Sequence, residues 1–130
     1  HSGPEADRHS FDARVSRRDL AETYLPHFER VVRDAGVLSI MTAYNAVDGV
    51  PVSGSRALVD DLLRTRWGFA GYVVTDCGAI NDMWRRHRYS ADAAVASAQA
   101  VRAGTDLECG TDFRRLITAV QRGLITEADL

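Results

Sequence analysis

Apolar residues follow two patterns that alternate along the chain. In one they recur with the period of a helix, and in the other they form short continuous runs. From Ser16 onward, apolar side chains recur every three or four residues, which predicts an amphipathic helix that ends at Gly36. Ser16 and Asp19 form an S-x-x-D start signal for this helix. Pro26 interrupts the pattern, so we expect a kink or a split into two helices near Leu25.

Short apolar runs alternate with the helical pattern and are typical of buried strands. The first run, VLSIMTAY, ends at a cluster of turn-forming residues, and the later runs are equally short. Further helices are predicted between and after these runs. The expected strands are residues 37–44, 71–75 and 105–108. Two of the expected helices have Ser55 and Ser90 as their N-caps, and a third carries Phe113.

The spacing of these elements is regular. The expected strand ends, Tyr44, Asp76 and Glu108, lie 32 residues apart in each step. Helices alternating with buried strands at this period predict βα units around a parallel sheet, and therefore the α/β class. Both a segment of a (β/α)8 barrel and part of an open doubly wound sheet fit this pattern.

Composition narrows the function classes. The 130 residues are 45% hydrophobic and 26% charged, as in an ordinary globular protein, and the net charge of −2 argues against a broad nucleic-acid footprint. No apolar run approaches the roughly 18 residues that span a bilayer. Two cysteines without a CxxC motif give no zinc signature, and no cofactor or metal is expected. The chain begins with His1, so we expect it to be a piece of a longer protein.

Polar residues at the expected strand ends are the first candidates for chemistry, because parallel α/β folds bind ligands at the carboxyl ends of their strands. Asp76 stands out, since it directly follows the run YVVT. A carboxylate on a rigid strand end could act as a nucleophile, general base or metal ligand. From position alone, a structural cap on the following loop is an equally good interpretation.

Four segments, in order along the chain, resemble motifs of glycoside hydrolase family 3. Residues 67–76 (WGFAGYVVTD) resemble the family's W-G-F-x-G-x-V-(S/T)-D signature, and residues 40–51 (IMTAYNAVDGVP) resemble its M-x-(S/A)-Y-N-x-V-N-G-x-P segment. Residues 3–8 (GPEADR) are similar to its E-x-x-R segment, and residues 104–110 (GTDLECG) to its G-T-D-x-x-x-G stretch. The resemblance extends from about residue 1 to residue 130.

This resemblance implies a retaining β-glycosidase that acts on terminal β-xylosides or β-glucosides. It implies that residues 1–130 are the C-terminal portion of an N-terminal, TIM-like (β/α)8 barrel domain, about three consecutive βα units with parallel strands. By the same resemblance, Asp76 is the catalytic nucleophile, Arg8 holds a sugar hydroxyl, and Met41 and Tyr44 line the sugar subsite. The expected partner is a glycoside or oligosaccharide, with no nucleic acid and no membrane.

Some parts of the family's machinery are expected outside these 130 residues. Retaining hydrolysis needs a proton-donating acid about 5–5.5 Å from the nucleophile. The remainder of the parent chain is expected to supply that acid/base residue, together with the family's Lys-His pair. The isolated segment is therefore expected to be inactive, and to associate through strands that are apolar on both faces.

The chain has two cysteines, and one of them departs from the β-glucosidase pattern. Cys77 stands where many family β-glucosidases have Trp, and Asp-Cys-Gly-Ala is similar to the β-xylosidase and arabinosidase branch. Cys77 and Cys109 end neighbouring strands, and we expect them to be free thiols, because a buried cysteine usually behaves as a small hydrophobe.

Trp84 fits either stacking on a sugar or loop packing, and Glu108 is expected to be structural.

Alternatives to an enzyme stay open at this point. A non-catalytic, carbohydrate-binding barrel fragment would carry the same motifs without the chemistry. A phosphate- or nucleotide-binding domain is disfavoured, because the chain has neither a GxGxxG motif nor a P-loop. His1 and His9 flank the segment of Arg8 and are further candidates for ligand contact, whereas the basic run 85–88 is expected to be a solvated loop.

Overall fold

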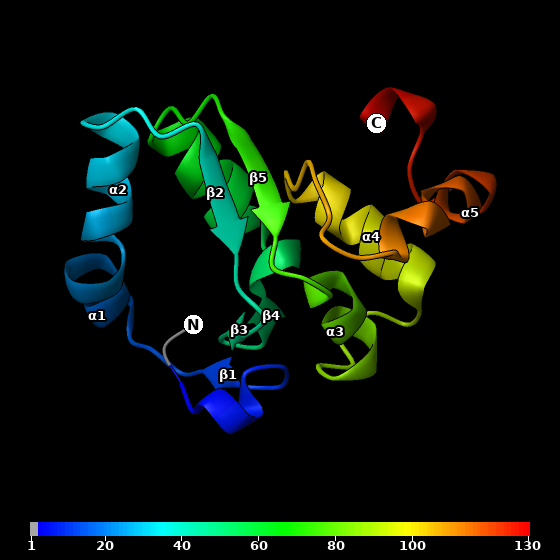
Figure 1. Ribbon diagram of the computed structural model, residues 1–130, viewed down its shortest axis with the longest axis horizontal. Coiled ribbons are helices and arrows are strands. Elements are labelled where there is room, and N and C mark those ends of the chain that lie inside the picture. Colours follow the sequence, from blue (N-terminus) through cyan, green and yellow to red (C-terminus); the bar gives the residue numbers. More distant parts are fainter. Residues whose placement is uncertain (1–2) are drawn as a thin grey trace.

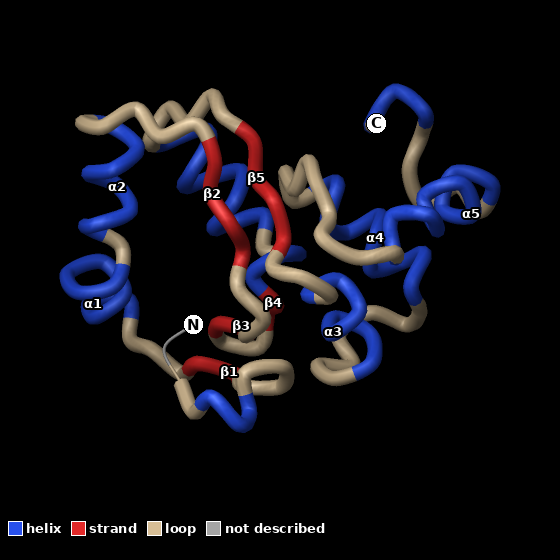
Figure 2. Tube along the Cα trace, in the orientation of Figure 1, coloured by secondary structure: helices blue, strands red, loops and turns tan. Residues whose placement is uncertain are grey.

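The computed structural model describes residues 3–130 as an α/β arrangement around a short parallel sheet (Figures 1 and 2). Strands β2 (Ser39–Thr42) and β5 (Tyr72–Thr75) run parallel, with Ser39 opposite Tyr72 and Thr42 opposite Thr75. The other elements, in chain order, are η1 (Glu5–Asp7), β1 (Asp12–Ala13), α1 (Arg17–Asp19), the π-helical η2 (Leu20–Tyr24), α2 (Pro26–Arg33), β3 (Ala46–Val47), β4 (Val50–Pro51), η3 (Val52–Gly54), the π-helical η4 (Ala57–Arg66), α3 (Ala79–Arg85), α4 (Ala93–Arg102), η5 (Asp112–Arg115), α5 (Leu116–Gln121) and η6 (Glu127–Asp129).

The third expected strand forms a single bridge. Leu107 pairs with Val74 in the parallel sense, its N–H donating to the Val73 carbonyl and its own carbonyl accepting from Thr75 N–H, both at 3.0 Å. The carboxylate of Asp106 accepts the Val73 N–H at 2.6 Å and so occupies a donor that a longer ladder would use. The predicted parallel α/β architecture is confirmed, but ladder pairing at residues 105–108 is shorter than expected.

The first helix starts and breaks where the sequence predicts. The Ser16 side chain accepts the N–H of Asp19 at 3.0 Å, which caps α1. The helix continues through η2 to Leu25, and Pro26 then occupies the first turn of α2. Proline lacks an N–H, so it fits the start of a new helix better than the interior of a continuous one.

Helix α4 begins later than expected, and the prediction of Ser90 as its cap is wrong. The cap is Asp92, whose carboxylate accepts the N–H groups of Ala94 and Val95 at 2.9 and 3.0 Å. A carboxylate satisfies both amides and also interacts favourably with the positive end of the helix dipole. The Ser90 hydroxyl donates to Gln99 instead.

The two faces of the β2–β5 sheet have different surroundings. On one face, Val73 is fully buried in a core with Val32 of α2 and Leu63 of η4. Side chains alternate along a strand, so Met41 and Tyr72 belong to the other face, where they are 60% and 47% exposed. Within residues 3–130, helices cover the sheet on one face, and apolar side chains remain exposed on the other.

Arg64 of η4 ties together the N-terminal edge of the sheet. Its guanidinium donates to the carbonyls of Gly71 and Gly104 at 3.0 and 2.9 Å, and to the Asp106 carboxylate at 2.5 Å. The Asp106 carboxylate also accepts the N–H of Val73. One side chain therefore joins the start of β5 to the segment that carries Leu107.

A second small sheet lies beyond the C-terminal end of β2. Strand β1 pairs in parallel with β3, and β3 and β4 form a hairpin whose turn residues, Asp48 and Gly49, have φ values of 48° and 86°. An Asp-Gly pair suits such a turn, because both positions need a positive φ. The Asp12 carboxylate accepts the Gly49 N–H at 2.7 Å. These contacts fix the segment that follows Arg8 against the end of β2.

Candidate active site

Asp76 lies directly after β5, at the C-terminal edge of the sheet. Its backbone N–H donates to the Thr42 carbonyl at 3.0 Å, so the hydrogen-bonded pairing with the β2 strand extends to this residue. Because side chains alternate, Asp76 belongs to the same sheet face as Val74 and Met41. Its Oδ1 accepts the N–H of Cys77 at 2.8 Å. The carboxylate is thus half-buried and held by its own loop.

Tyr44 approaches this loop from the end of β2. Its hydroxyl donates to the Cys77 carbonyl at 3.1 Å. Desolvation raises the pKa of Tyr44 above its usual value near 10, and a hydrogen bond with Asp76 and the charge of that carboxylate raise it further, while Arg8 opposes the shift. Tyr44 is therefore a neutral hydroxyl donor beside Asp76 at any physiological pH.

Arg8 reaches Tyr44 from the N-terminal segment. Its Cζ lies 5.8 Å from the centroid of the Tyr44 ring, within the range of a cation–π contact. The guanidinium also donates to the Glu5 carboxylate at 2.9 Å, and the side chain is 38% exposed. The segment is anchored where Ala46 N–H donates to the Phe11 carbonyl at 2.9 Å.

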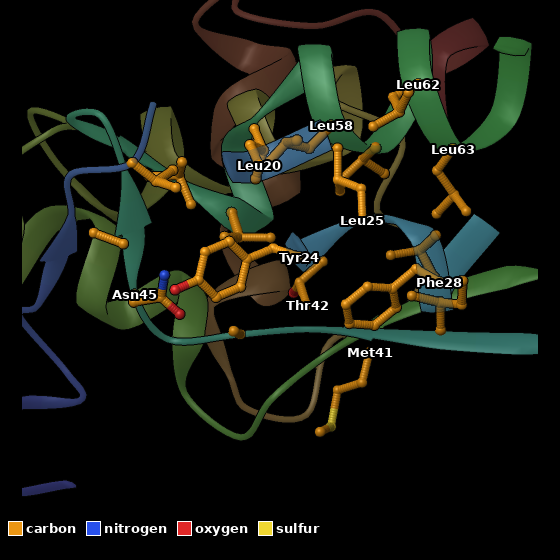
Figure 3. Close-up of a pocket in the computed structure, with 18 of the residues that line it drawn as sticks. Leu20, Tyr24, Leu25, Phe28, Met41, Thr42, Asn45, Leu58, Leu62 and Leu63 are labelled. Carbon is orange, nitrogen blue, oxygen red and sulfur yellow. The ribbon is translucent and has the colours of Figure 1, made fainter. Parts of the chain in front are cut away.

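Met41 lies apart from these three groups. It occupies the face of β2 that Asp76 shares, but lies opposite Val74, two residues before Asp76. In Figure 3 its side chain points away from the labelled leucine and phenylalanine side chains on the other side of β2. The structure therefore brings Arg8, Tyr44 and Asp76 together, and places Met41 on the adjacent open face of the sheet.

Cys77 and Cys109 form a disulfide, so the expectation of free thiols is wrong. Their Cα atoms lie 4.3 Å apart. The Gly78 N–H donates to the Cys109 carbonyl at 2.7 Å, and the Cys109 N–H donates to the Thr75 hydroxyl at 3.1 Å. Cys77 lies two residues after the end of β5, and Cys109 lies two residues after the bridge residue Leu107, so parallel alignment of the two segments brings them together. The equal 32-residue steps were the signal in the sequence for this pairing.

The remaining candidates have structural partners. The Glu108 carboxylate accepts the N–H groups of Asp112 and Phe113 at 2.9 and 2.6 Å, which supports its expected structural role. Trp84 donates its indole N–H to Asp112 at 3.1 Å, and Arg85 lies 4.3 Å above its ring. Both contacts favour packing over sugar stacking for Trp84. His1 lies outside the described residues.

Sequence reasoning missed a pair that borders the site. The Nδ1 atom of His9 lies 2.6 Å from Oδ2 of Asp82, and the His9 ring lies against the ring of Tyr44. His87 adds a second contact, since its Nε2 is 2.8 Å from the Tyr44 carbonyl oxygen. His9 was a candidate only through its place beside Arg8, and no motif pointed to Asp82.

Two hollows differ in character. A mostly apolar cavity of about 520 Å³ lies between the helices of residues 17–33 and the sheet, and is shown in Figure 3. A polar hollow of about 460 Å³ is bordered by His9, Asp82 and Arg85. The larger cavity faces the helix-covered side of β2, away from the face of Asp76, so volume does not identify the reactive site here.

No cluster of three or more His, Cys, Asp or Glu side chains in residues 3–130 is arranged to hold a metal ion. No helix in the same range has the length and apolarity needed to cross a bilayer.

Residues 3–130 therefore form a parallel α/β fold that carries polar side chains, Asp76 and Tyr44, at the carboxyl ends of its strands. The chain belongs to glycosyl hydrolase family 3, because the N-terminal domain of that family matches residues 1–130. The N-terminal domain of this family is a TIM-barrel-like α/β fold. The resemblance of the four motifs is thereby confirmed at the level of the family.

Similar proteins are β-xylosidases and β-glucosidases. A xylan 1,4-β-xylosidase from Xylanibacter ruminicola is 44% identical over 133 residues, which cover 100% of this chain and 15% of the relative. A GH3 exo-β-xylosidase, XlnD, solved with a xylobiose aziridine activity-based probe, superposes with a TM-score of 0.92 at 38% identity, over 94% of this chain and 16% of that one. A β-glucosidase from Erythrobacter marinus gives a TM-score of 0.88 at 28% identity, over 96% and 17%. The chain thus spans about one sixth of the length of these proteins.

Proposed function

We propose that the parent protein hydrolyses terminal, non-reducing β-linked sugars by a retaining double displacement in which Asp76 is the nucleophile. The observation that carries the proposal is the position of Asp76 directly after β5, where Tyr44 donates to the following loop and Arg8 lies over the Tyr44 ring. A nucleophile on a strand end is held by the backbone ladder, which gives the rigidity that such chemistry needs. Membership of family 3 supports glycoside hydrolysis as the reaction class.

Each group has a defined role in this mechanism. A carboxylate oxygen of Asp76 attacks the anomeric carbon while the bond to the leaving oxygen breaks, and an acid from elsewhere in the parent protein protonates that oxygen. Water then displaces the glycosyl group, which releases the sugar with retained configuration and restores the Asp76 carboxylate. Arg8 donates to a sugar hydroxyl, Tyr44 donates beside the nucleophile, and Met41 lines the subsite on the shared sheet face.

The chain fits the C-terminal portion of an N-terminal, TIM-like barrel domain, as about three consecutive βα units. The equal strand spacing and the open apolar face of β2 and β5 support this placement, because the interior of such a barrel is filled with side chains from all its strands. The rest of the parent protein would supply the acid/base residue and the Lys-His pair.

The sugar is proposed to be a pentoside, with xylose first. Cys77 follows the nucleophile directly, and its disulfide with Cys109 lies in the loop bordering the subsite. Two of the similar proteins are named as β-xylosidases, and one was solved with a xylobiose-derived probe. A pocket shaped for xylose excludes the extra hydroxymethyl group of glucose by steric conflict. Comparison of aryl xyloside, arabinoside and glucoside hydrolysis tests this assignment, and a clear preference for the glucoside would reject it.

A mechanism-based inhibitor tests the nucleophile. The parent protein is incubated with a 2-deoxy-2-fluoro-β-xyloside carrying a good leaving group, which forms a slowly hydrolysed ester with the attacking carboxylate. Peptide mass spectrometry is expected to find the label on Asp76. Asp76→Asn is expected to stay unlabelled, and Asp61→Asn, an exposed carboxylate on η4, is the matched control that labels normally.

Two outcomes contradict the proposal. A label on a different carboxylate would transfer the nucleophile role to that residue. Absence of any label, combined with normal binding of xylose oligosaccharides, would instead support the non-catalytic, carbohydrate-binding alternative.

A further inference from the structure

Asp82 is a buried carboxylate that the mechanism above does not use. It lies on α3, the helix that begins three residues after Asp76, and its side chain is 8% exposed. Its Oδ2 lies 2.6 Å from Nδ1 of His9, a residue 73 positions earlier in the chain. A buried carboxylate without a partner is costly, so this contact fixes His9 strongly relative to α3.

His9 transmits this constraint to Tyr44. The two ring centroids lie 4.3 Å apart, with the ring planes inclined at 55°. His87 contacts the backbone of Tyr44, since its ring Nε2 is 2.8 Å from the Tyr44 carbonyl oxygen. The backbone N–H of His87 donates to the Asp82 carbonyl at 2.8 Å. Tyr44 is thus contacted at its ring and at its backbone by two histidines, both of which are bound to Asp82.

The loop of Asp76, the proposed nucleophile, is hydrogen-bonded to the helix that carries Asp82. The Asp76 carbonyl accepts the N–H of Ala79 at 3.0 Å, and the Gly78 carbonyl accepts the N–H of Asp82 at 3.1 Å. The first turn of α3 therefore connects the carboxylate of Asp82 rigidly to the loop of Asp76. A shift of one ångström between a nucleophile and its neighbouring donor can cost a factor of about 100 in rate.

We propose that Asp82 and His9 form a positioning pair that holds the hydroxyl of Tyr44 in register with Asp76. The proposal rests on the proposed function for its kinetic consequence, whereas its geometric content concerns this chain alone. The groups that face the His9 ring are Asp82 and Tyr44, and Arg85 and Arg86 border the same hollow. His9 acts through Tyr44 and need not touch the sugar.

Two substitutions distinguish the contribution of the His9 ring from that of its hydrogen bond with Asp82. His9→Phe keeps an aromatic ring against Tyr44 but removes the contact with Asp82, and Asp82→Asn keeps the size of that side chain while removing its charge. His27→Phe is the matched control, because this exposed histidine on α2 makes a similar ring contact with Phe28 at 4.3 Å. In the parent protein, His9→Phe is expected to lower kcat/KM about tenfold or more through kcat, with the fold retained by circular dichroism.

A double-mutant cycle with Tyr44→Phe distinguishes positioning from a merely structural role. If His9 acts by placing the Tyr44 hydroxyl, then His9→Phe is expected to cost less than about twofold once that hydroxyl is gone. The same full loss in the Tyr44→Phe background would show that His9 acts independently and would overturn the proposal. So would unchanged kinetics of both His9→Phe and Asp82→Asn.

A crystal structure of the parent protein with His9→Phe decides the geometric part without any activity. The hydroxyl of Tyr44 is expected to leave the Cys77 carbonyl, and a Tyr44 that keeps its place would overturn the proposal. If Asp76 is not labelled in the wild-type protein, the proposed function fails, and this structural readout still judges the pair. If Asp76 is labelled and Tyr44 does not move, only the positioning pair fails.

Discussion

Removal of the Cys77–Cys109 disulfide is expected to lower stability without changing the active-site structure. The bond closes a loop with a sequence separation of 32 residues, which contains α3 and α4. In the unfolded chain, such a closure removes conformational entropy worth about 3.7 kcal/mol at 25 °C. In the folded chain, the hydrogen bonds of Gly78 with Cys109 and of Cys109 with Thr75 hold the two segments together independently of the sulfur atoms. The double variant Cys77→Ser/Cys109→Ser is therefore expected to fold normally but unfold more easily.

Hydrogen exchange in increasing urea is the assay, because it reports on this segment within the longer parent protein. Peptides from β5 and α4 are expected to show an opening free energy about 3–4 kcal/mol lower in the double variant. Wild-type protein treated with a reductant is the control, and it is expected to match the variant. If mass spectrometry shows the bond intact in the oxidised wild type, and all three samples still exchange alike, the loop-entropy reasoning is refuted.

Three further substitutions test the site and the sheet edge. Asp76→Asn is expected to lower kcat by a factor of about 1,000 or more with the fold retained, and near-wild-type turnover would remove Asp76 from its role. Arg8→Ala is expected to lower kcat/KM about 10- to 100-fold while Asp76 still reacts with the fluoro-xyloside, and an unchanged kcat/KM would place Arg8 outside the site. Arg64→Met leaves two carbonyls and the Asp106 carboxylate without their shared donor, so urea denaturation is expected to give a loss of about 3 kcal/mol. Arg66→Met, exposed on the same helix, is its control, and equal stability of the two variants would contradict the role given to Arg64.

The parts of the structure that the sequence predicted are those fixed by neighbours in the chain. Ser16 caps its helix, and Pro26 divides it, because each effect depends on atoms within one helical turn. The position of Asp76 at a strand end followed from an apolar run of only a few residues. Periodicity and local chemistry were sufficient for these features.

The features that escaped prediction depend on competition or on long-range alignment. Asp92 displaced Ser90 as a cap because two acceptors compete within three residues, and only the folded chain selects between them. The disulfide needed the relative position of two strand ends. His9 and Asp82 are separated by 73 residues and share no pattern, so only the folded structure brings them together.

The contacts of Arg64 stabilise one edge of the sheet, and the proposed reactive groups lie at the other. Its contacts with Gly71, Gly104 and Asp106 secure the edge where the strands begin, whereas Asp76 and Tyr44 occupy the edge where they end. Loops at the second edge can accumulate substitutions without disturbing the first. Specificity in this scaffold is therefore free to diverge between sugars during evolution, and a designer can vary the loops at the second edge, apart from Asp76 and Cys77, while the stability set by the opposite edge is preserved.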